Sequence, residues 1–230
     1  MIKNAVFDLD HTLFDRYATL RKIAEIADAR ILPFKDVSDR KAIGELMVKT
    51  DKENILFGWQ AIFNVYSTLG ILKPEVTAQN IYEEYFAKMY SLAAVPYDFT
   101  KPMLMSLRKK GIKTGLITNG HHDLQYAKLN MLGLPEMFDF IVVSGDTPYQ
   151  KPDTRVFDYF CEKFGVLPEE SLYIGDSPLN DVYASGSAGF TPVWVKTSGH
   201  WPFDYIKKPK YTVDTVEEIP DIIEKINKKD

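Results

Sequence analysis

Hydrophobic and polar positions follow two different periods along this chain, and the change of period divides it. A short apolar run, Ala5-Val6-Phe7, indicates the end of a buried strand. From residue 16 to residue 94 the apolar positions instead recur at helical spacing, and no strand pattern interrupts them. The first of these helical segments carries Leu20, Ile23, Ala24, Ala27 and Ile31. Ile43, Leu46 and Met47 indicate a second helix, and the apolar positions from Ile55 to Leu69 indicate a third. This pattern predicts an all-helical unit inserted after the first strand.

From Val95 onward, short apolar strands alternate with helical segments. The helices are expected to end at glycines such as Gly133 and Gly165. Further strands are expected at residues 112–118, 140–144, 172–174, 192–195 and 211–213. Alternation of this kind predicts an α/β fold with a doubly wound parallel sheet.

The two patterns together predict two domains. We expect residues 1–15 and 95–230 to form an α/β core, and residues 16–94 a small helical domain. The net charge of −4 gives no general attraction to a nucleic acid polymer, and no apolar run is long enough to span a membrane. The single cysteine excludes an internal disulfide and fits a reducing compartment. We therefore expect a cytoplasmic protein with no membrane or nucleic acid partner.

Polar side chains follow four of the predicted strands directly. The first strand ends in Asp8 and Asp10, and strand residues two apart point to the same face. The other strand ends are followed by Thr118-Asn119-Gly120, by Asp146 and Lys151, and by Gly175-Asp176-Ser177-Pro178 with Asp181. Each motif alone can equally be a turn or a helix cap. Their joint placement favours a site, because parallel sheets bind ligands beyond the carboxyl ends of their strands.

The residue types at these positions favour phosphoryl transfer. Clustered carboxylates without histidines at matching spacing suit a hard cation, Mg²⁺ rather than zinc. Asp8 can attack phosphorus to form an aspartyl-phosphate. Mg²⁺, Lys151, Thr118 and the amides near Asn119 could neutralise the phosphoryl oxygens. Asp10 would protonate the leaving alcohol and then take a proton from the attacking water.

These residues resemble the four motifs of the haloacid dehalogenase superfamily of hydrolases. Asp8-Leu9-Asp10-His11-Thr12 is similar to the first motif, Asp-x-Asp-x-Thr. Thr118 resembles the second motif, Lys151 the third, and Gly175-Asp176 with Asp181 the acidic fourth. The resemblance implies a Rossmann-like core, with the helical domain as a small cap that closes over the phosphate and excludes water.

The resemblance also implies a role for each residue that handles the phosphoryl group. Asp8 would be the nucleophile and a Mg²⁺ ligand. Asp10 would be the acid and base, and its backbone carbonyl would contact the ion. Thr118 and Lys151 would bind the phosphoryl group, and Lys151 would also steady Asp8.

The remaining motif residues are implied to support the metal and the loop. Asp176 would be the main downstream Mg²⁺ ligand, and Asp181 would support it directly or through water. Thr12 completes the first motif. His11 stands where many members of the family carry glycine, so contacts near the site entrance are expected to differ.

Several functions share these motifs. Dehalogenases of the family lack the second aspartate of the first motif, so Asp10 favours a phosphatase. The segment Ile117-Thr118-Asn119-Gly120-His121-His122 and the aromatic helical domain look most similar to the pyrimidine 5′-nucleotidase branch, with a nucleoside 5′-monophosphate as substrate. A sugar phosphatase or phosphomutase of the same superfamily is the alternative, and a non-catalytic binding scaffold is the alternative from another class. In each enzymatic case the substrate is a small phosphorylated metabolite.

Overall fold

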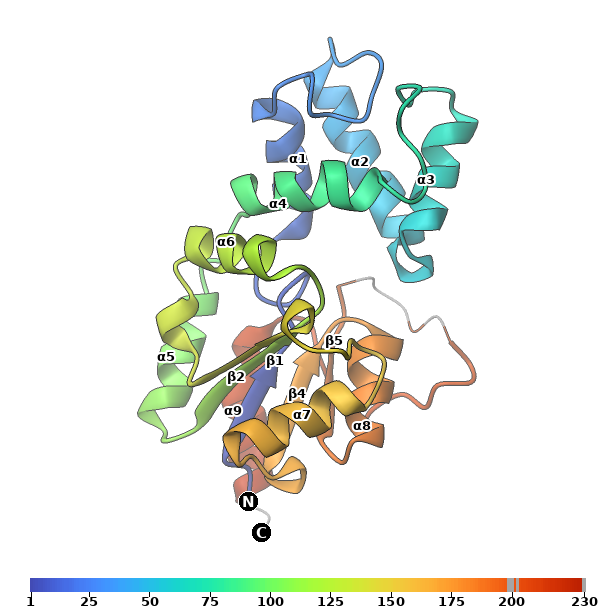
Figure 1. The fold of residues 1–230 in the computed structure, drawn as a ribbon. Coiled ribbons are helices and arrows are strands. Elements are labelled where there is room, and N and C mark those ends of the chain that lie inside the picture. The colour runs from blue at the N-terminus through green and yellow to red at the C-terminus, as the bar shows by residue number, and fades with distance from the viewer. Residues whose placement is uncertain (198–200, 202, 229–230) are drawn as a thin grey trace. The chain divides into compact units, whose positions relative to one another are not determined.

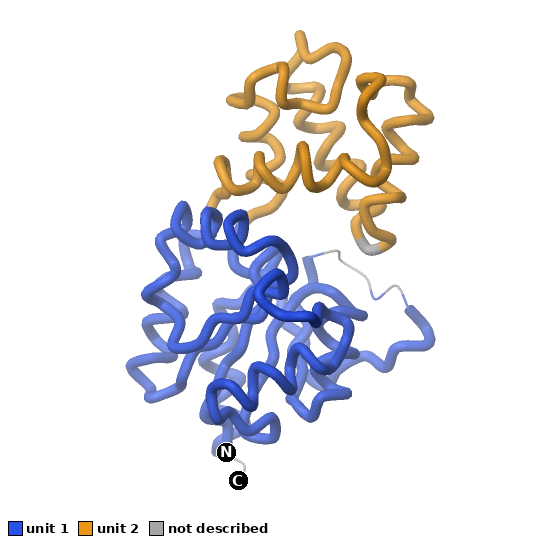
Figure 2. The backbone as a smooth tube through the Cα atoms, in the orientation of Figure 1, with its two compact units in different colours: residues 1–14, 96–230 blue, residues 15–95 orange. Residues whose placement is uncertain are grey.

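The chain forms two compact units in the computed structural model, which describes residues 1–197, 201 and 203–228. Unit 1 comprises Met1–Phe14 and Pro96–Asp230, and unit 2 comprises Asp15–Val95 (Figure 2). Unit 2 is thus an insertion within the sequence of unit 1. Among the described helices, none is both long and apolar enough to cross a membrane.

A parallel sheet forms the centre of unit 1 (Figure 1). In the described part of the chain it has six strands in the order β3-β2-β1-β4-β5-β6. The strands are β1 (Asn4–Phe7), β2 (Lys113–Thr118), β3 (Phe140–Val143), β4 (Ser171–Gly175), β5 (Thr191–Val195) and β6 (Tyr211–Val213). The central strand β1 pairs with both β2 and β4, where Phe7 lies opposite Leu116 and Ile174. The predicted α/β fold with a parallel sheet is confirmed.

Helices cover the sheet of unit 1. Figure 1 draws α7 in front of the strands and α9 behind them. The longer helices are α5 (Thr100–Lys109), α6 (His122–Leu132), α7 (Arg155–Phe164) and α9 (Ile219–Asn227), and α8 (Ala184–Ser187) is a single turn. Short helical turns occupy η3 (Pro135–Met137), η4 (Ser144–Asp146), η5 (Pro168–Glu170), η6 (Pro178–Tyr183) and η7 (Val216–Glu218). The predicted helix ends at Gly133 and Gly165 are confirmed, since both glycines adopt a left-handed conformation after α6 and α7.

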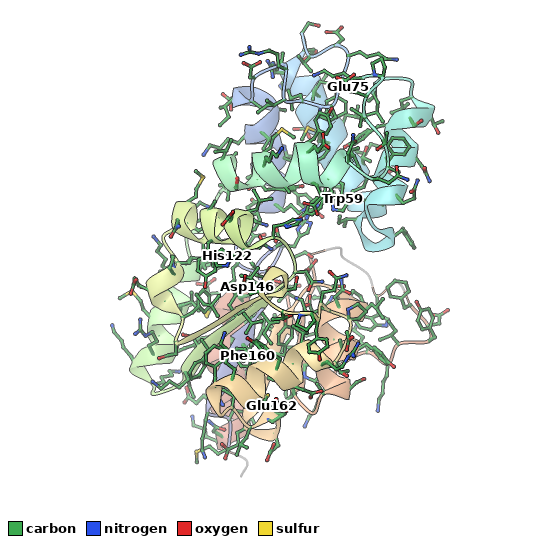
Figure 3. All side chains as sticks on the ribbon, in the orientation of Figure 1. Trp59, Glu75, His122, Asp146, Phe160 and Glu162 are labelled. Carbon is green, nitrogen blue, oxygen red and sulfur yellow. The ribbon has the colours of Figure 1, made fainter. Side chains whose placement is uncertain are left out.

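Helix α7 shows why these segments pack on the sheet. Its apolar positions recur on one side, so Phe157 and Phe160 are fully buried against the strands, and Glu162 lies on the exposed side (Figure 3). The Phe157 ring meets the Tyr173 ring of β4 edge-on at 5.0 Å. Burial of each phenylalanine side chain contributes about 1.5–3 kcal/mol. This packing fixes the strand whose end carries Asp176.

Unit 2 is helical in the region the structure describes. Its elements are α1 (Arg16–Ile26), α2 (Arg40–Asn54), η1 (Ile55–Phe57), α3 (Trp59–Thr68), η2 (Ile81–Phe86) and α4 (Ala87–Ala93). Helix α1 ends at Ile26, where Ala27 takes an extended conformation, and the Asp28 carboxylate then accepts a hydrogen bond from the Arg30 backbone N–H in the turn that follows. The segment Ile55–Leu69 is not one helix, because Gly58 interrupts it at a φ of 83°. Both expectations of longer helices were wrong.

The interior of unit 2 holds a buried ion pair among aromatic rings. The Arg16 guanidinium donates to Asp51 at 2.7 Å, and both side chains are almost fully buried. The guanidinium also lies over the rings of Tyr90 and Trp59, at 4.9 and 5.5 Å. Trp59 in turn stacks on Tyr82, with ring centroids 4.9 Å apart. Aromatic side chains of the inserted segment therefore pack largely on one another.

The insertion begins and ends at adjacent points of the backbone. Within unit 1, Phe14 and Pro96 form an isolated antiparallel bridge. Within unit 2, the Asp15 N–H donates to the Val95 carbonyl at 2.9 Å. The Asp15 carboxylate also caps α1 by accepting from the Ala18 N–H at 2.8 Å.

Candidate active site

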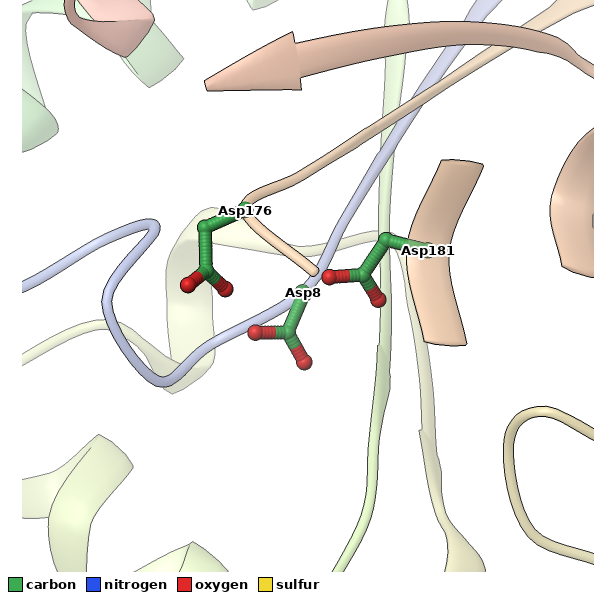
Figure 4. Close-up of side chains that lie close together, drawn as sticks. All are labelled: Asp8, Asp176 and Asp181. Atoms are coloured by element: carbon green, nitrogen blue, oxygen red, sulfur yellow. The ribbon is translucent and has the colours of Figure 1, made fainter. Parts of the chain in front are cut away.

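Three carboxylates from two neighbouring strands meet at the carboxyl edge of the sheet. Asp8 follows β1, and Asp176 and Asp181 follow β4. One oxygen from each of the three lies within 4.8 Å of the others (Figure 4). Gly175 allows this approach, because a Cβ at that position would lie 2.4 Å from the Asp181 carboxyl group. The structure therefore brings the predicted N-terminal and downstream acids together.

Lys151 is the cation at the centre of this cluster. Its buried ammonium donates to Asp8 and to Asp181, each at 2.7 Å, and to the Tyr173 hydroxyl at 2.9 Å. Asn119 fixes its position: the Asn119 side-chain amide donates to the Lys151 carbonyl at 2.8 Å, and the Lys151 N–H donates to the Asn119 amide oxygen at 2.9 Å. The Asn119 side chain therefore ties two loops together, which leaves its backbone amide as the group for the predicted phosphate contact.

Burial and like charges dominate the electrostatics of this cluster. Burial raises the pKa of Asp8 to about 7; the Asp181 and Asp10 charges also raise it, and Lys151 opposes them. For Lys151, burial disfavours the ammonium, but the Asp181 and Asp8 carboxylates hold its pKa well above the usual value. One lysine ammonium thus lies among several carboxylates, so the cluster carries an excess of negative charge. Hard oxygen donors with excess negative charge suit a divalent cation such as Mg²⁺.

Hydrogen bonds from the loops orient the two downstream acids. Asp176 accepts from the Thr197 hydroxyl at 3.2 Å through its carboxylate, and from the Trp194 indole N–H at 2.8 Å through its carbonyl. The second carboxylate oxygen of Asp181 accepts from the Ser177 N–H at 2.9 Å. Each carboxylate is therefore held in place by the protein itself.

Two residues of α6 that the sequence analysis missed contact Asp10. The Lys128 ammonium donates to both carboxylate oxygens of Asp10, each at 2.7 Å. The Gln125 side-chain amide donates to Asp10 at 3.3 Å and to the Thr118 hydroxyl at 2.8 Å. A signal was present, because residues three apart share a face of the helix predicted directly after Thr118 and Asn119.

The turn after β1 explains two other positions of the first motif. His11 is buried and adopts a φ of 64°, a left-handed conformation that favours glycine. The Leu13 N–H donates to the Leu9 carbonyl at 3.0 Å, which closes the turn. Thr12 is buried within it, and its hydroxyl has no hydrogen-bond partner among the described residues. Thr12 thus belongs to the turn that follows the carboxylates.

A sequence profile of haloacid dehalogenase-like hydrolases matches residues 5–195, which is most of the chain. The chain belongs to the haloacid dehalogenase-like hydrolase family. This confirms the family inferred from the four motifs. The matched region begins within β1 and ends with β5, and it contains every candidate site residue from Asp8 to Asp181.

Relatives of this hydrolase include proteins named as phosphatases. It is 27% identical to the glyceraldehyde 3-phosphate phosphatase of Methanocaldococcus jannaschii, over 99% of this chain and 100% of the relative. It is 37% identical to the phosphoserine phosphatase of Thermus thermophilus, over 54% of this chain and 49% of that protein. The crystal structure of a HAD phosphatase from Thermococcus onnurineus superposes with a TM-score of 0.61 at 24% identity, over 96% of this chain and 98% of that one. The last similarity establishes the fold alone.

Proposed function

We propose that this hydrolase is a Mg²⁺-dependent phosphatase that acts on a small phosphorylated metabolite through an aspartyl-phosphate at Asp8. The observation that carries the proposal is the contact of Lys151 with both Asp8 and Asp181 beside Asp176. Phosphoryl transfer requires an acid, a cation and further metal-binding oxygens close together, and this edge of the sheet carries all three. The phosphatase names of the relatives support the same reaction.

The proposed roles are those that the motifs imply for each side chain. An Asp8 carboxylate oxygen forms a bond to phosphorus as the ester oxygen leaves with a proton from Asp10. A water molecule then gives a proton to Asp10 and attacks phosphorus, which returns Asp8 as a free carboxylate and releases inorganic phosphate. Lys151 and Thr118 bind the phosphoryl oxygens.

The residues around Asp8 fit a bound Mg²⁺. Asp8, Asp176 and the backbone carbonyl of Asp10 would hold the ion, with Asp181 in support. When bound, Mg²⁺ supplies positive charge that offsets the phosphoryl oxygens. Lys151 already opposes part of the charge of Asp8 and Asp181.

We propose that unit 2 serves as a cap that excludes water during the reaction. Its insertion directly after the first motif, between Phe14 and Pro96, supports this role. The substrate is proposed to be a small metabolite, because the relatives are named for small phosphate esters. A cytoplasmic location stays a prediction from the sequence and its single cysteine. A nucleoside 5′-monophosphate stays a prediction from the sequence.

The test is a substrate panel with and without Mg²⁺. It contains glyceraldehyde 3-phosphate, phosphoserine, sugar phosphates and nucleoside 5′-monophosphates, and inorganic phosphate is measured. We expect Mg²⁺-dependent release that Asp8→Asn reduces by about 1000-fold or more. Asp158→Asn, on the exposed side of α7, is the matched control and should retain full activity. An isomeric ester as product would indicate a mutase, halide release a dehalogenase, and no turnover of any ester would contradict the proposal.

A further inference from the structure

Lys128 is a buried lysine whose charge is directed at Asp10. Its side chain is only 1% exposed, and its ammonium lies 2.7 Å from each carboxylate oxygen of Asp10. The ammonium also lies 5.8 Å from the centre of the Phe14 ring. A buried ammonium costs free energy unless it is paired. Lys128 therefore needs the Asp10 carboxylate as its partner, and the same contact restricts the orientation of that carboxylate.

Gln125 connects the same carboxylate to the predicted phosphate-binding residue. Its side-chain amide donates to Asp10 at 3.3 Å, to the Thr118 hydroxyl at 2.8 Å and to the Asn119 carbonyl. Gly120 makes room for it, because a Cβ there would lie 3.0 Å from the Gln125 amide nitrogen. One side chain thus sets the distance between the acid and Thr118.

The start of α6, which carries Gln125 and Lys128, is itself anchored. The His122 ring nitrogen lies 2.9 Å from the Asp146 carboxylate, which follows β3 (Figure 3). The His122 ring also packs on the Tyr126 ring at 4.5 Å. The segment after β3 therefore anchors the first turn of the helix that carries Lys128.

We propose that Lys128 is a positioning residue that holds the Asp10 carboxylate in the orientation required for proton transfer, with Gln125 fixing its distance from Thr118. This inference rests on the proposed phosphatase function. Lys128 acts through Asp10 and does not contact the substrate. Two hydrogen bonds from one ammonium restrict rotation of the carboxylate, and the Gln125 contact to one oxygen alone distinguishes the two oxygens before substrate binds.

The test compares leaving groups with different needs for a proton. An alkyl phosphate needs a proton on its leaving oxygen, whereas p-nitrophenolate leaves without one. Formation of the aspartyl-phosphate is measured in single turnovers with Mg²⁺ for wild type, Lys128→Met and Lys128→Arg. We expect Lys128→Met to slow the alkyl ester by about 100-fold, within the range that general acid catalysis supplies, and to slow p-nitrophenyl phosphate far less. Lys128→Arg, which can also donate to both oxygens, should recover much of the loss.

Controls separate this role from a general loss of structure. Lys109→Met, on the exposed side of α5, should leave both rates unchanged. An equal loss on both esters would overturn the inference, and so would a raised KM with an unchanged kcat, which would make Lys128 a substrate-binding residue. If Lys128→Met does not fold, Gln125→Leu is expected to show the same dependence on the leaving group, and its absence there would also overturn the inference. A wild-type protein that hydrolyses no ester would instead refute the proposed function, and the inference with it.

Discussion

Replacing Lys151 by methionine tests the charge balance of the site directly. In the metal-free protein, Lys151 is the ammonium between Asp8 and Asp181, and the three side chains are 3%, 10% and 2% exposed. Lys151→Met keeps most of the volume of the side chain but leaves two buried carboxylates face to face. Removing one partner of a buried ion pair costs about 3–5 kcal/mol, because the remaining charge is no longer compensated. We expect a loss of this size here.

The assay is thermal unfolding in the presence of a chelator. For a protein of this size, each kcal/mol corresponds to about 2–4 °C in Tm, so the expected decrease is about 6–20 °C. Lys3→Met is the control: Lys3 pairs with Glu170 at 2.6 Å, but its side chain is 60% exposed. Surface pairs of that kind contribute about 0–1 kcal/mol, so that variant should lose no more than about 4 °C.

The reasoning fails if Lys151→Met unfolds at the wild-type temperature. The double variant Lys151→Met with Asp181→Asn gives an independent check, because it removes one of the two buried carboxylate charges that Lys151→Met leaves uncompensated. It should be more stable than Lys151→Met alone, which is the signature of energetic coupling between neighbouring groups. If the losses of stability from the two substitutions simply add, Asp181 and Lys151 are not energetically coupled.

Two further outcomes follow from the same geometry. Because the pKa of Asp8 rises from 3.8 to about 7, the folded metal-free protein binds its proton more tightly than the unfolded chain does; this contribution to stability is complete below pH 3.8 and is lost as the pH rises through about 7. Mg²⁺ competes with that proton, so it should raise Tm more at pH 8 than at pH 6, and an equal rise would contradict the role of Asp8. Gly175→Ala should cost about 1–3 kcal/mol and weaken Mg²⁺ binding in calorimetry, because the added Cβ would overlap Asp181. Gly186→Ala, whose Cβ would lie 3.6 Å from Pro192, should bind Mg²⁺ as the wild type does, and unchanged binding by Gly175→Ala would refute the argument.

The sheet and the polar residues at its carboxyl edge could be predicted, because both depend on the order of apolar and polar residues along the sequence. Each strand is an apolar run with a polar residue directly after it, and the observed strands lie within one residue of the predicted ones. In a parallel sheet those polar residues share one edge whatever the order of the strands. The shared edge of Asp8, Lys151 and Asp181 could therefore be predicted without the topology, whereas their direct contacts depend on the strand order, which places β1 between β2 and β4.

The contacts of α6 could not be predicted in the same way. Helical spacing places Gln125 and Lys128 on one face of α6. Whether that face meets Asp10 depends on how the helix packs within unit 1. The predictions of the helix ends in unit 2 were wrong for a different reason. Periodicity reports only the apolar face, whereas the turn at Asp28 and the φ of Gly58 are set by backbone hydrogen bonding and conformation.

The adjacent entry and exit of the inserted unit have an evolutionary consequence. Phe14 and Pro96 face each other across a backbone bridge, so the chain leaves unit 1 after β1 and returns to it at an adjacent point of the backbone. Segments of other lengths or folds can replace the one between these residues while the strand order and the position of Asp8 stay unchanged. Selection can therefore exchange the inserted unit as a module and leave the chemistry of the ancestral core intact.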